Sequence, residues 1–199
     1  MNWKPLFLSA VVFSVALPEG YSQQANSAEQ AELAKKYPSI RIKVNVGTRR
    51  RQVNGSSYMK TMVMTPSVAI ESASTQPMAA ASATCLLITM DTREKYTRGD
   101  EELTVATNES IDIPAVPKGQ RRSFEFAELQ TQFDSDRDST NIGGDVYKYF
   151  IMAVFSDDKK FLHFETNCQS LDKHLKANPD LRIKFLGLKP GEKFRTRFQ

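Results

Sequence analysis

Three aspartates alternate with other residues in the segment FDSDRDSTNIGGD. Counted as an EF-hand loop, Asp134, Asp136 and Asp138 fall at positions one, three and five, and Asp145 falls at position twelve. Carboxylate oxygens at such positions are the ligands that calcium prefers. However, Ser139 stands where the sharp turn needs glycine, and an aspartate replaces the longer bidentate glutamate at position twelve. Two interpretations remain, a calcium site made of these four aspartates and a solvated connection between strands.

Catalysis by a nucleophile requires a base beside an activated hydroxyl or thiol, and the chain has only two histidines. His163 lies in the strand-like segment FLHFET and His174 in a helix-like segment, and no G-x-S-x-G motif is present. The histidines and cysteines match no compact zinc-finger spacing either. These patterns predict a protein that is not an enzyme and that needs no cofactor, with calcium as the one alternative.

The first 22 residues have the order of an export signal. Lys4 supplies a positive charge, and the apolar stretch from Pro5 to Leu17 is followed by small residues. This stretch is too short for a membrane-spanning helix, which takes about 20 residues. We expect cleavage after Ser22, with Ala16 as a second candidate site; the alternative is a buried N-terminal helix. The expected location of the mature chain is secreted or periplasmic, including the cell surface, with no membrane insertion after cleavage.

Charge sets the expected class of partner. The formal net charge is +4, and the basic clusters Arg49–Arg51 and Arg121–Arg122 lie beside turn signals, where solvated charge is the ordinary explanation. For an exported chain this excess does not predict nucleic-acid binding. The expected partner is an extracellular or envelope protein or a glycan.

Two cysteines, Cys85 and Cys168, allow a single pairing. Disulfides form in the oxidising compartments that exported proteins reach. A Cys85–Cys168 disulfide is one hypothesis, and two buried, unpaired thiols are the other, because the sequence does not tell whether the two Cα atoms lie within bridging distance.

The surrounding elements are mostly strands. Residues 23–38 form a polar linker or a short helix, and the alternation from Ile40 to Val46 predicts a half-buried strand. Asn54 and Gly55 predict a hairpin turn into a second strand, which Pro66 places at an edge or a bulge. The segment DVYKYFIMAVFS is apolar on both faces in its second half, as a central strand would be.

The last part of the chain contains the one clear helix signal. A helix is predicted from about residue 169, where SLDKHLKANP has leucines four residues apart and a terminating Asn178-Pro179. The closing segment LRIKFLGLKPGEKF is predicted to be extended. With eight or nine short strands in total, the pattern predicts an all-β sandwich with a short C-terminal helix.

Residues 58–166 resemble bacterial immunoglobulin-like domains of the cell-adhesion-related type. The resemblance consists of the apolar spacing in PSVAIESASTQPMAAASATCLLI and of a glycine turn at Ile113–Gly119 before SFEF. It implies an immunoglobulin-like β-sandwich with an extracellular binding or spacer role, and it implies no catalytic residues. The chain departs from the family by an extra N-terminal hairpin and by its extension after residue 166.

Together these features predict residues 1–22 as a signal peptide and residues 39–199 as one sandwich domain with a helical extension. The expected function is a non-catalytic binding or structural role in the cell envelope or the secreted fraction. Two alternatives stay open, a carbohydrate-binding or carbohydrate-processing module and a calcium-dependent adhesion module. If a protein partner adds a strand, the segment from Ile40 to Val46 is the expected edge.

Overall fold

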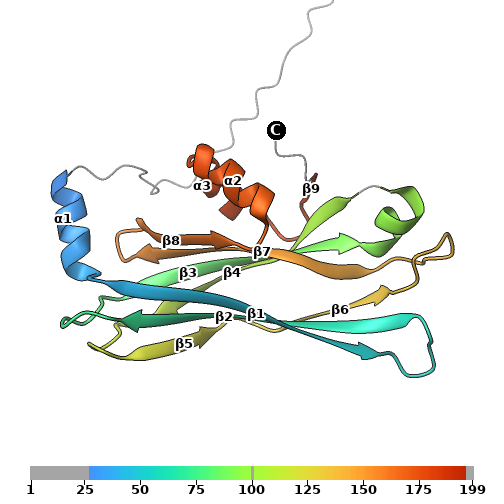
Figure 1. The fold of residues 1–199 in the computed structure, drawn as a ribbon, viewed down its shortest axis with the longest axis horizontal. Coiled ribbons are helices and arrows are strands. Elements are labelled where there is room, and N and C mark those ends of the chain that lie inside the picture. The colour runs from blue at the N-terminus through green and yellow to red at the C-terminus, as the bar shows by residue number, and fades with distance from the viewer. Residues whose placement is uncertain (1–26, 100, 196–199) are drawn as a thin grey trace, which may run out of the picture.

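The computed structural model describes residues 27–99 and 101–195, so the predicted signal peptide lies outside the described residues. Thirteen elements follow one another along these described residues (Figure 1). In chain order they are α1 (Ser27–Lys36), β1 (Ile40–Gln52), β2 (Met59–Ser72), β3 (Ala81–Asp91), the π-helical turn η1 (Glu94–Arg98), β4 (Glu102–Ile113), β5 (Arg121–Glu125), β6 (Leu129–Asp134), β7 (Asp145–Ser156), β8 (Phe161–Thr166), α2 (Gln169–Ala177), α3 (Leu181–Leu186) and β9 (Lys193–Arg195).

The strands form two antiparallel sheets that lie face to face, which confirms the predicted all-β sandwich (Figure 1). In the first sheet, β2 pairs with β1 on one side and with both β5 and β6 on the other. The second sheet has the order β8-β7-β3-β4-β9. Helices α2 and α3 lie on the outer face of the second sheet, so that half of the molecule has a third layer (Figure 1). No helix in the described part of the chain is long and apolar enough to span a membrane.

The first sheet begins with the predicted hairpin. β1 and β2 pair without a register shift from Ile40 opposite Ser72 to Gln52 opposite Lys60. Gly55 has a φ of 79°, the left-handed conformation that such a turn favours in glycine. The apolar side chains of β1 pack against the core between the sheets, while the alternate side chains are exposed. The half-buried strand predicted from the alternating pattern is therefore confirmed.

Pro66 lies in the middle of β2, which has neighbours on both sides, so the predicted edge position is wrong. The side of β2 that carries β5 and β6 is interrupted, because β5 pairs with residues 67–71 and β6 with residues 59–64. Pro66 sits between these two ranges, and its carbonyl accepts a hydrogen bond from Phe126 N (3.0 Å). The missing proline N–H therefore coincides with the break between β5 and β6, where no ladder bond is needed.

The second sheet is buried on both faces, as predicted for the strand Asp145–Ser156. On the inner face, Cys85 and Met152 belong to the core between the two sheets. On the outer face, Leu86 and Ile151 pack with Leu171 of α2 in a separate core under the helices. A strand covered on both faces is apolar at consecutive positions, which explains the continuous apolar run of β7.

Two predicted segments have a different structure. Residues 181–186 form α3 where an extended chain was predicted, and only Lys193–Arg195 is a strand there. In residues 23–38 the helix alternative holds from Ser27 to Lys36. Tyr37 follows this helix and is buried, and its hydroxyl accepts a hydrogen bond from Asp157 N (2.9 Å) in the turn between β7 and β8. This contact fixes the C-terminal end of α1 to the second sheet.

Candidate functional site

The aspartate segment is the connection from β6 of the first sheet to β7 of the second. Asp134, at its start, is only 2% exposed, and each of its carboxylate oxygens accepts a backbone hydrogen bond. Oδ1 accepts from Asp136 N and Oδ2 from Ile142 N, both at 2.9 Å. Asp138 Oδ1 accepts from Thr140 N (2.9 Å) and from the Thr140 hydroxyl (2.7 Å). Asp134 and Asp138 therefore fix the backbone of this connection.

The fourth predicted ligand, Asp145, lies at the start of β7 beside Thr89 of β3, whose hydroxyl is 3.4 Å from its carboxylate. Desolvation and the neighbouring charge of Asp91 raise the pKa of Asp145. The buried Asn141 joins the parts of the loop, because it donates to Asp136 O and accepts from Gly143 N. Within residues 27–99 and 101–195, no group of three or more His, Cys, Asp or Glu side chains is arranged to hold a metal ion.

The two cysteines are free thiols in this structure, and they lie on opposite faces of the second sheet. Cys85 is part of the core between the sheets, and burial raises the pKa of its thiol to about 12. Cys168 packs at the edge of the core under α2 and α3, and its sulfur is 3.3 Å from the Ser170 hydroxyl. Cys85 is buried and Cys168 is half-exposed, and the Cys85–Cys168 disulfide stays a prediction.

The histidines and the acidic turn have simple local partners. His163 of β8 has its Nε2 atom 3.0 Å from Glu165 Oε2, two residues further along the same strand. Lys36, at the end of α1, forms ion pairs with both Asp157 (3.2 Å) and Asp158 (3.1 Å). These aspartates are therefore a tether for the N-terminal helix.

The outer edge of β1 is an open edge of the first sheet. Among the described residues β1 pairs only with β2, along its whole length of 13 residues. Successive residues of an antiparallel strand turn their N–H and C=O groups alternately toward the partner and away from it. Ser39 O accepts a hydrogen bond from Ala73 N (3.1 Å), which directs the odd-numbered residues of β1 toward β2. The backbone groups that point outward are those of Ile40, Ile42, Val44, Val46, Thr48 and Arg50.

Cationic side chains line this open edge. Arg41, Lys43, Arg49 and Arg51 are exposed and lie on the outer face of the first sheet, which no helix of the described chain covers. Arg41 pairs with Glu71 of β2 at 3.6 Å, at the far end from the arginine run. The predicted solvated arginine cluster and the predicted edge strand thus share one outer face, on which Asn45 and Gly47 separate Lys43 from Arg49.

A shallow hollow lies beside the arginine run, on the same outer face. It has a volume of about 560 Å³, and β1, β2 and β6 all contribute to its walls. Val63 forms part of its floor and is 7% exposed although it lies on the outer face. Glu128 and Gln130 complete the hollow beside Arg49 and Arg51. Sequence reasoning missed Gln130, because only the pairing of β6 with β2 places it there.

Comparisons with known proteins do not assign this chain to a family. No family model matches the chain, and no curated protein matches it significantly. A crystal structure from Akkermansia muciniphila is similar over 65% of this chain and 72% of that chain, with 9% identity and a TM-score of 0.32. The X-ray structure of Northeast Structural Genomics Consortium target SoR45 is similar over 65% and 85%, with 12% identity and a TM-score of 0.27. At these TM-scores neither likeness supports an argument about function.

Proposed function

We propose that this protein is an exported, non-catalytic binding protein of the cell envelope or secreted fraction. Its partner is an extracellular or envelope protein that contributes an extended, acidic segment, which adds as a strand along β1. The observation that carries the proposal is the open edge of β1, where the backbone groups of alternate residues have no strand partner in the described part of the chain. An added strand obtains affinity from these main-chain hydrogen bonds and specificity from the side chains that flank them.

The charge of the edge selects the partner. Cations along an edge strand oppose pairing with a second copy of the same strand, because like charges would lie side by side. The same cations favour a strand whose outer-face residues are acidic, and such a combination of attraction and repulsion produces specificity. The other face of an added strand would meet Ile42 and Val44, which are half-buried, so the matching segment alternates apolar and acidic residues.

An immunoglobulin-like assignment within the sandwich class belongs to the same proposal. It is supported by the two antiparallel sheets packed around one inter-sheet core and by the glycine turn at Ile113–Gly119, where Gly119 has a φ of 67°. The helical third layer and the extra β1–β2 hairpin are additions to that plan.

The test uses a nine-residue peptide of alternating valine and glutamate, with a valine–lysine peptide of the same length as control. We expect the acidic peptide to bind and to slow amide hydrogen exchange at the outward-facing residues of β1. Because the attraction is partly between exposed charges, added salt should weaken it. Equal binding of the two peptides, or protection located elsewhere, would contradict the proposal.

A matched pair of variants tests the geometry. Thr48 is exposed and its N–H points outward, so Thr48→Pro removes one edge donor without removing a bond to β2. We expect Thr48→Pro to lose peptide binding and Thr48→Val to keep it, with similar melting temperatures. The export part of the proposal is tested separately by N-terminal sequencing of the mature protein, which should begin at Gln23.

A further inference from the structure

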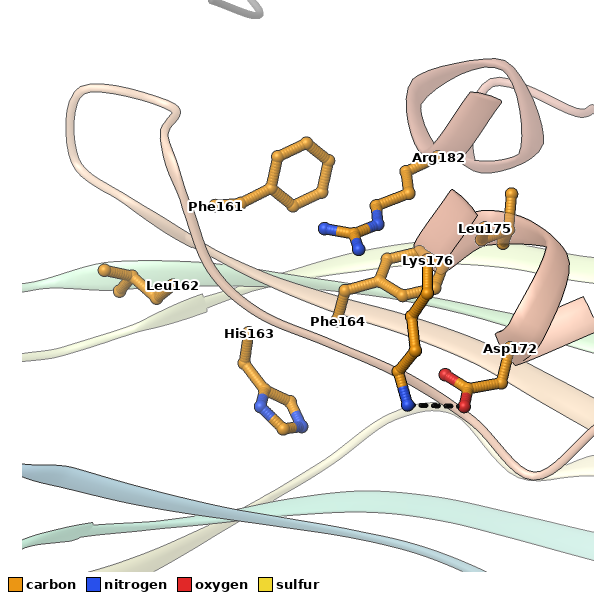
Figure 2. A pocket seen from close by; sticks show the side chains of 8 residues that line it. All are labelled: Phe161, Leu162, His163, Phe164, Asp172, Leu175, Lys176 and Arg182. Atoms are coloured by element: carbon orange, nitrogen blue, oxygen red, sulfur yellow. Dashed lines mark hydrogen bonds and ion pairs between the residues drawn. The ribbon is translucent and has the colours of Figure 1, made fainter. Parts of the chain in front are cut away.

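A pocket of about 280 Å³ lies on the opposite layer of the molecule, between β8 and the two C-terminal helices (Figure 2). Phe161 and Phe164 come from β8, Leu175 and Lys176 from α2, and Arg182 from α3. Figure 2 shows the guanidinium of Arg182 reaching toward the two phenyl rings. Its Cζ atom is 5.3 Å from the centre of the Phe164 ring, a cation–π distance.

A bulge in β8 creates the aromatic wall. Phe161 pairs with Phe155 and His163 with Val154, so Leu162 is an extra residue that faces no partner. In a regular strand without this bulge, Phe161 and Phe164 would lie on opposite faces, because they are three residues apart and side chains alternate. With it, both rings lie on the helix-covered face, and their centroids are 6.4 Å apart in an edge-to-face contact. Figure 2 shows His163 pointing away from these rings.

Arg182 differs from the other basic residues around the pocket. Lys176 is paired with Asp172 at 2.7 Å, and His163 is 3.0 Å from Glu165. The Arg182 side chain forms no hydrogen bond or ion pair with any described residue, and its Nε atom is buried without a partner. A buried donor without an acceptor is costly, whereas the planar guanidinium is well suited to bind a carboxylate through two parallel hydrogen bonds. The cation–π contact with Phe164 keeps the guanidinium beside the rings, where such a ligand would enter.

We infer that this pocket, whose wall is Phe161, Phe164 and Arg182, binds the carboxylate of an acidic sugar, a hexuronate unit of an anionic glycan. The carboxylate accepts from the Arg182 guanidinium, and the apolar C–H face of the sugar ring lies against the phenyl rings. The Lys176–Asp172 pair at the rim offers both a donor and an acceptor for ring hydroxyls. The volume matches a single sugar ring, since it is near the lower end of ligand pockets.

The ring-bearing carboxylate fits better than a bare anion. Apolar side chains from β8 and α2 form one part of the lining, beside the polar groups of Asp172, Lys176 and Arg182, and an inorganic anion would leave that apolar part in contact with water. Asp172 is the single carboxylate among the residues that line the pocket, whereas glycoside cleavage uses a pair of carboxyl groups, so the lining fits ligand binding better than cleavage. The site is separate from β1, so a negative result for this pocket would leave the strand-addition proposal unaffected, and the reverse also holds.

The experiment titrates ¹⁵N-labelled protein with tri-galacturonate and follows the Arg182 Nε–H signal by NMR. The methyl ester of the same trisaccharide is the matched ligand, because it keeps the rings and removes the charges. We expect tri-galacturonate to shift the Arg182 signal. The ester should bind with an affinity at least about tenfold lower, because hydrogen bonds to charged groups are stronger than those to neutral groups. Acetate and inorganic phosphate serve as anions without a sugar ring.

Arg182→Lys keeps the positive charge but loses the planar fork, so we expect about a tenfold loss of affinity. The matched control is Arg137→Lys, because Arg137 also stacks on a ring, with its Cζ atom 5.7 Å from the centre of the Tyr96 ring, and lies outside this pocket. Binding in the control should be unchanged.

The inference is overturned if tri-galacturonate leaves the Arg182 signal in place, if acetate or phosphate binds as tightly, or if the ester binds as well as the acid. The two ligands are compared on the unmodified protein, so this test does not depend on the folding of a variant.

Discussion

The two sheets of the sandwich share one core but differ in what covers their outer faces. The second sheet carries α2 and α3, and Leu171 and Leu175 are fully buried against it. The first sheet has a polar outer face, and its edge strand β1 presents Arg41, Lys43 and Arg49 to solvent. Burying both faces of a sheet adds stability through apolar area, whereas an uncovered face and an open edge leave backbone and charge available to a partner. Among the described strands, the longest edge strand, β1, therefore belongs to the less buried of the two sheets.

The comparison is tested most strongly by truncating one apolar side chain on each sheet. Leu171→Ala removes a side chain that is 0% exposed under the helices, and we expect a loss of about 2–5 kcal/mol in the free energy of unfolding. Val44→Ala, at a half-buried position of β1, should cost about 1 kcal/mol, because the site is open to solvent. Urea unfolding followed by circular dichroism measures both. Equal losses would show that β1 is packed as tightly as the helix layer.

The connection between the sheets gives the next effect. Gly144 has a φ of 109°, and a Cβ atom there would lie 2.7 Å from Phe133 Cα of β6. We expect Gly144→Ala to cost about 3 kcal/mol, because it combines an unfavourable φ with a collision against backbone. Gly55→Ala is the matched control, with a φ of 79° and no atom within 4 Å of the new Cβ. Its cost should be only about 1 kcal/mol in the same urea experiment. A similar cost for both would exclude the close approach of the sheets at Gly144.

Variants of the aspartate connection distinguish a purely structural role of its carboxylates from calcium binding. Asp134→Ala leaves the N–H groups of Asp136 and Ile142 without acceptors, and we expect a loss of about 2 kcal/mol. If these carboxylates only stabilise the loop, the loss is the same in EDTA and in millimolar calcium. Asp136→Ala, at an exposed position, is the control and should change the melting temperature little. A calcium-dependent rise in melting temperature that either variant abolishes would establish a metal site instead.

The smallest effect concerns the tether of α1. Burial raises the pKa of Asp157, but the hydrogen bonds from Lys36 and Tyr37 outweigh it, so the net shift is downward. A lowered folded-state pKa stabilises the protein above the ordinary aspartate pKa of 3.8, and this contribution is lost as the pH falls through the folded-state value. Lys36→Ala should therefore lower the melting temperature slightly near neutral pH and not at all in strong acid. Because both side chains are exposed, high salt should reduce the difference. A difference that persists in acid or in high salt would show that Lys36 does not act through these ion pairs, and no difference at neutral pH would assign the tether to Tyr37 alone.

Local pattern was sufficient for the elements whose environment is simple. The alternation of Ile40, Ile42 and Val44 predicted a half-buried strand, and the continuous apolar run in β7 predicted burial on both faces, because each pattern follows from what lies on either side of the strand. The residues Leu181, Ile183 and Phe185 were ambiguous, since they fit both a two-residue and a helical period. Contact of α3 with the second sheet decides in favour of a helix, and a short segment does not encode that contact.

Candidate sites were harder to predict for a related reason. The spacing of Asp134, Asp136 and Asp138 correctly located a polar connection, but it did not show that backbone N–H groups already occupy the Asp134 carboxylate. The sequence did not indicate Arg182 as a site residue, because its position beside Phe164 requires both the α3 helix and the bulge at Leu162. Such sites arise from tertiary contacts between segments, and spacing along the chain does not report them.

The proline in the middle of β2 has a consequence for how the chain could vary in length. Since Pro66 faces the gap between β5 and β6, each of these short strands keeps its own register with β2. Ala127 and Glu128 in the gap are exposed, so extra residues inserted between them would loop out into solvent and displace neither strand. The segment between β5 and β6 is therefore a position in the first sheet where a peptide tag or a small domain could be inserted while the sandwich still folds.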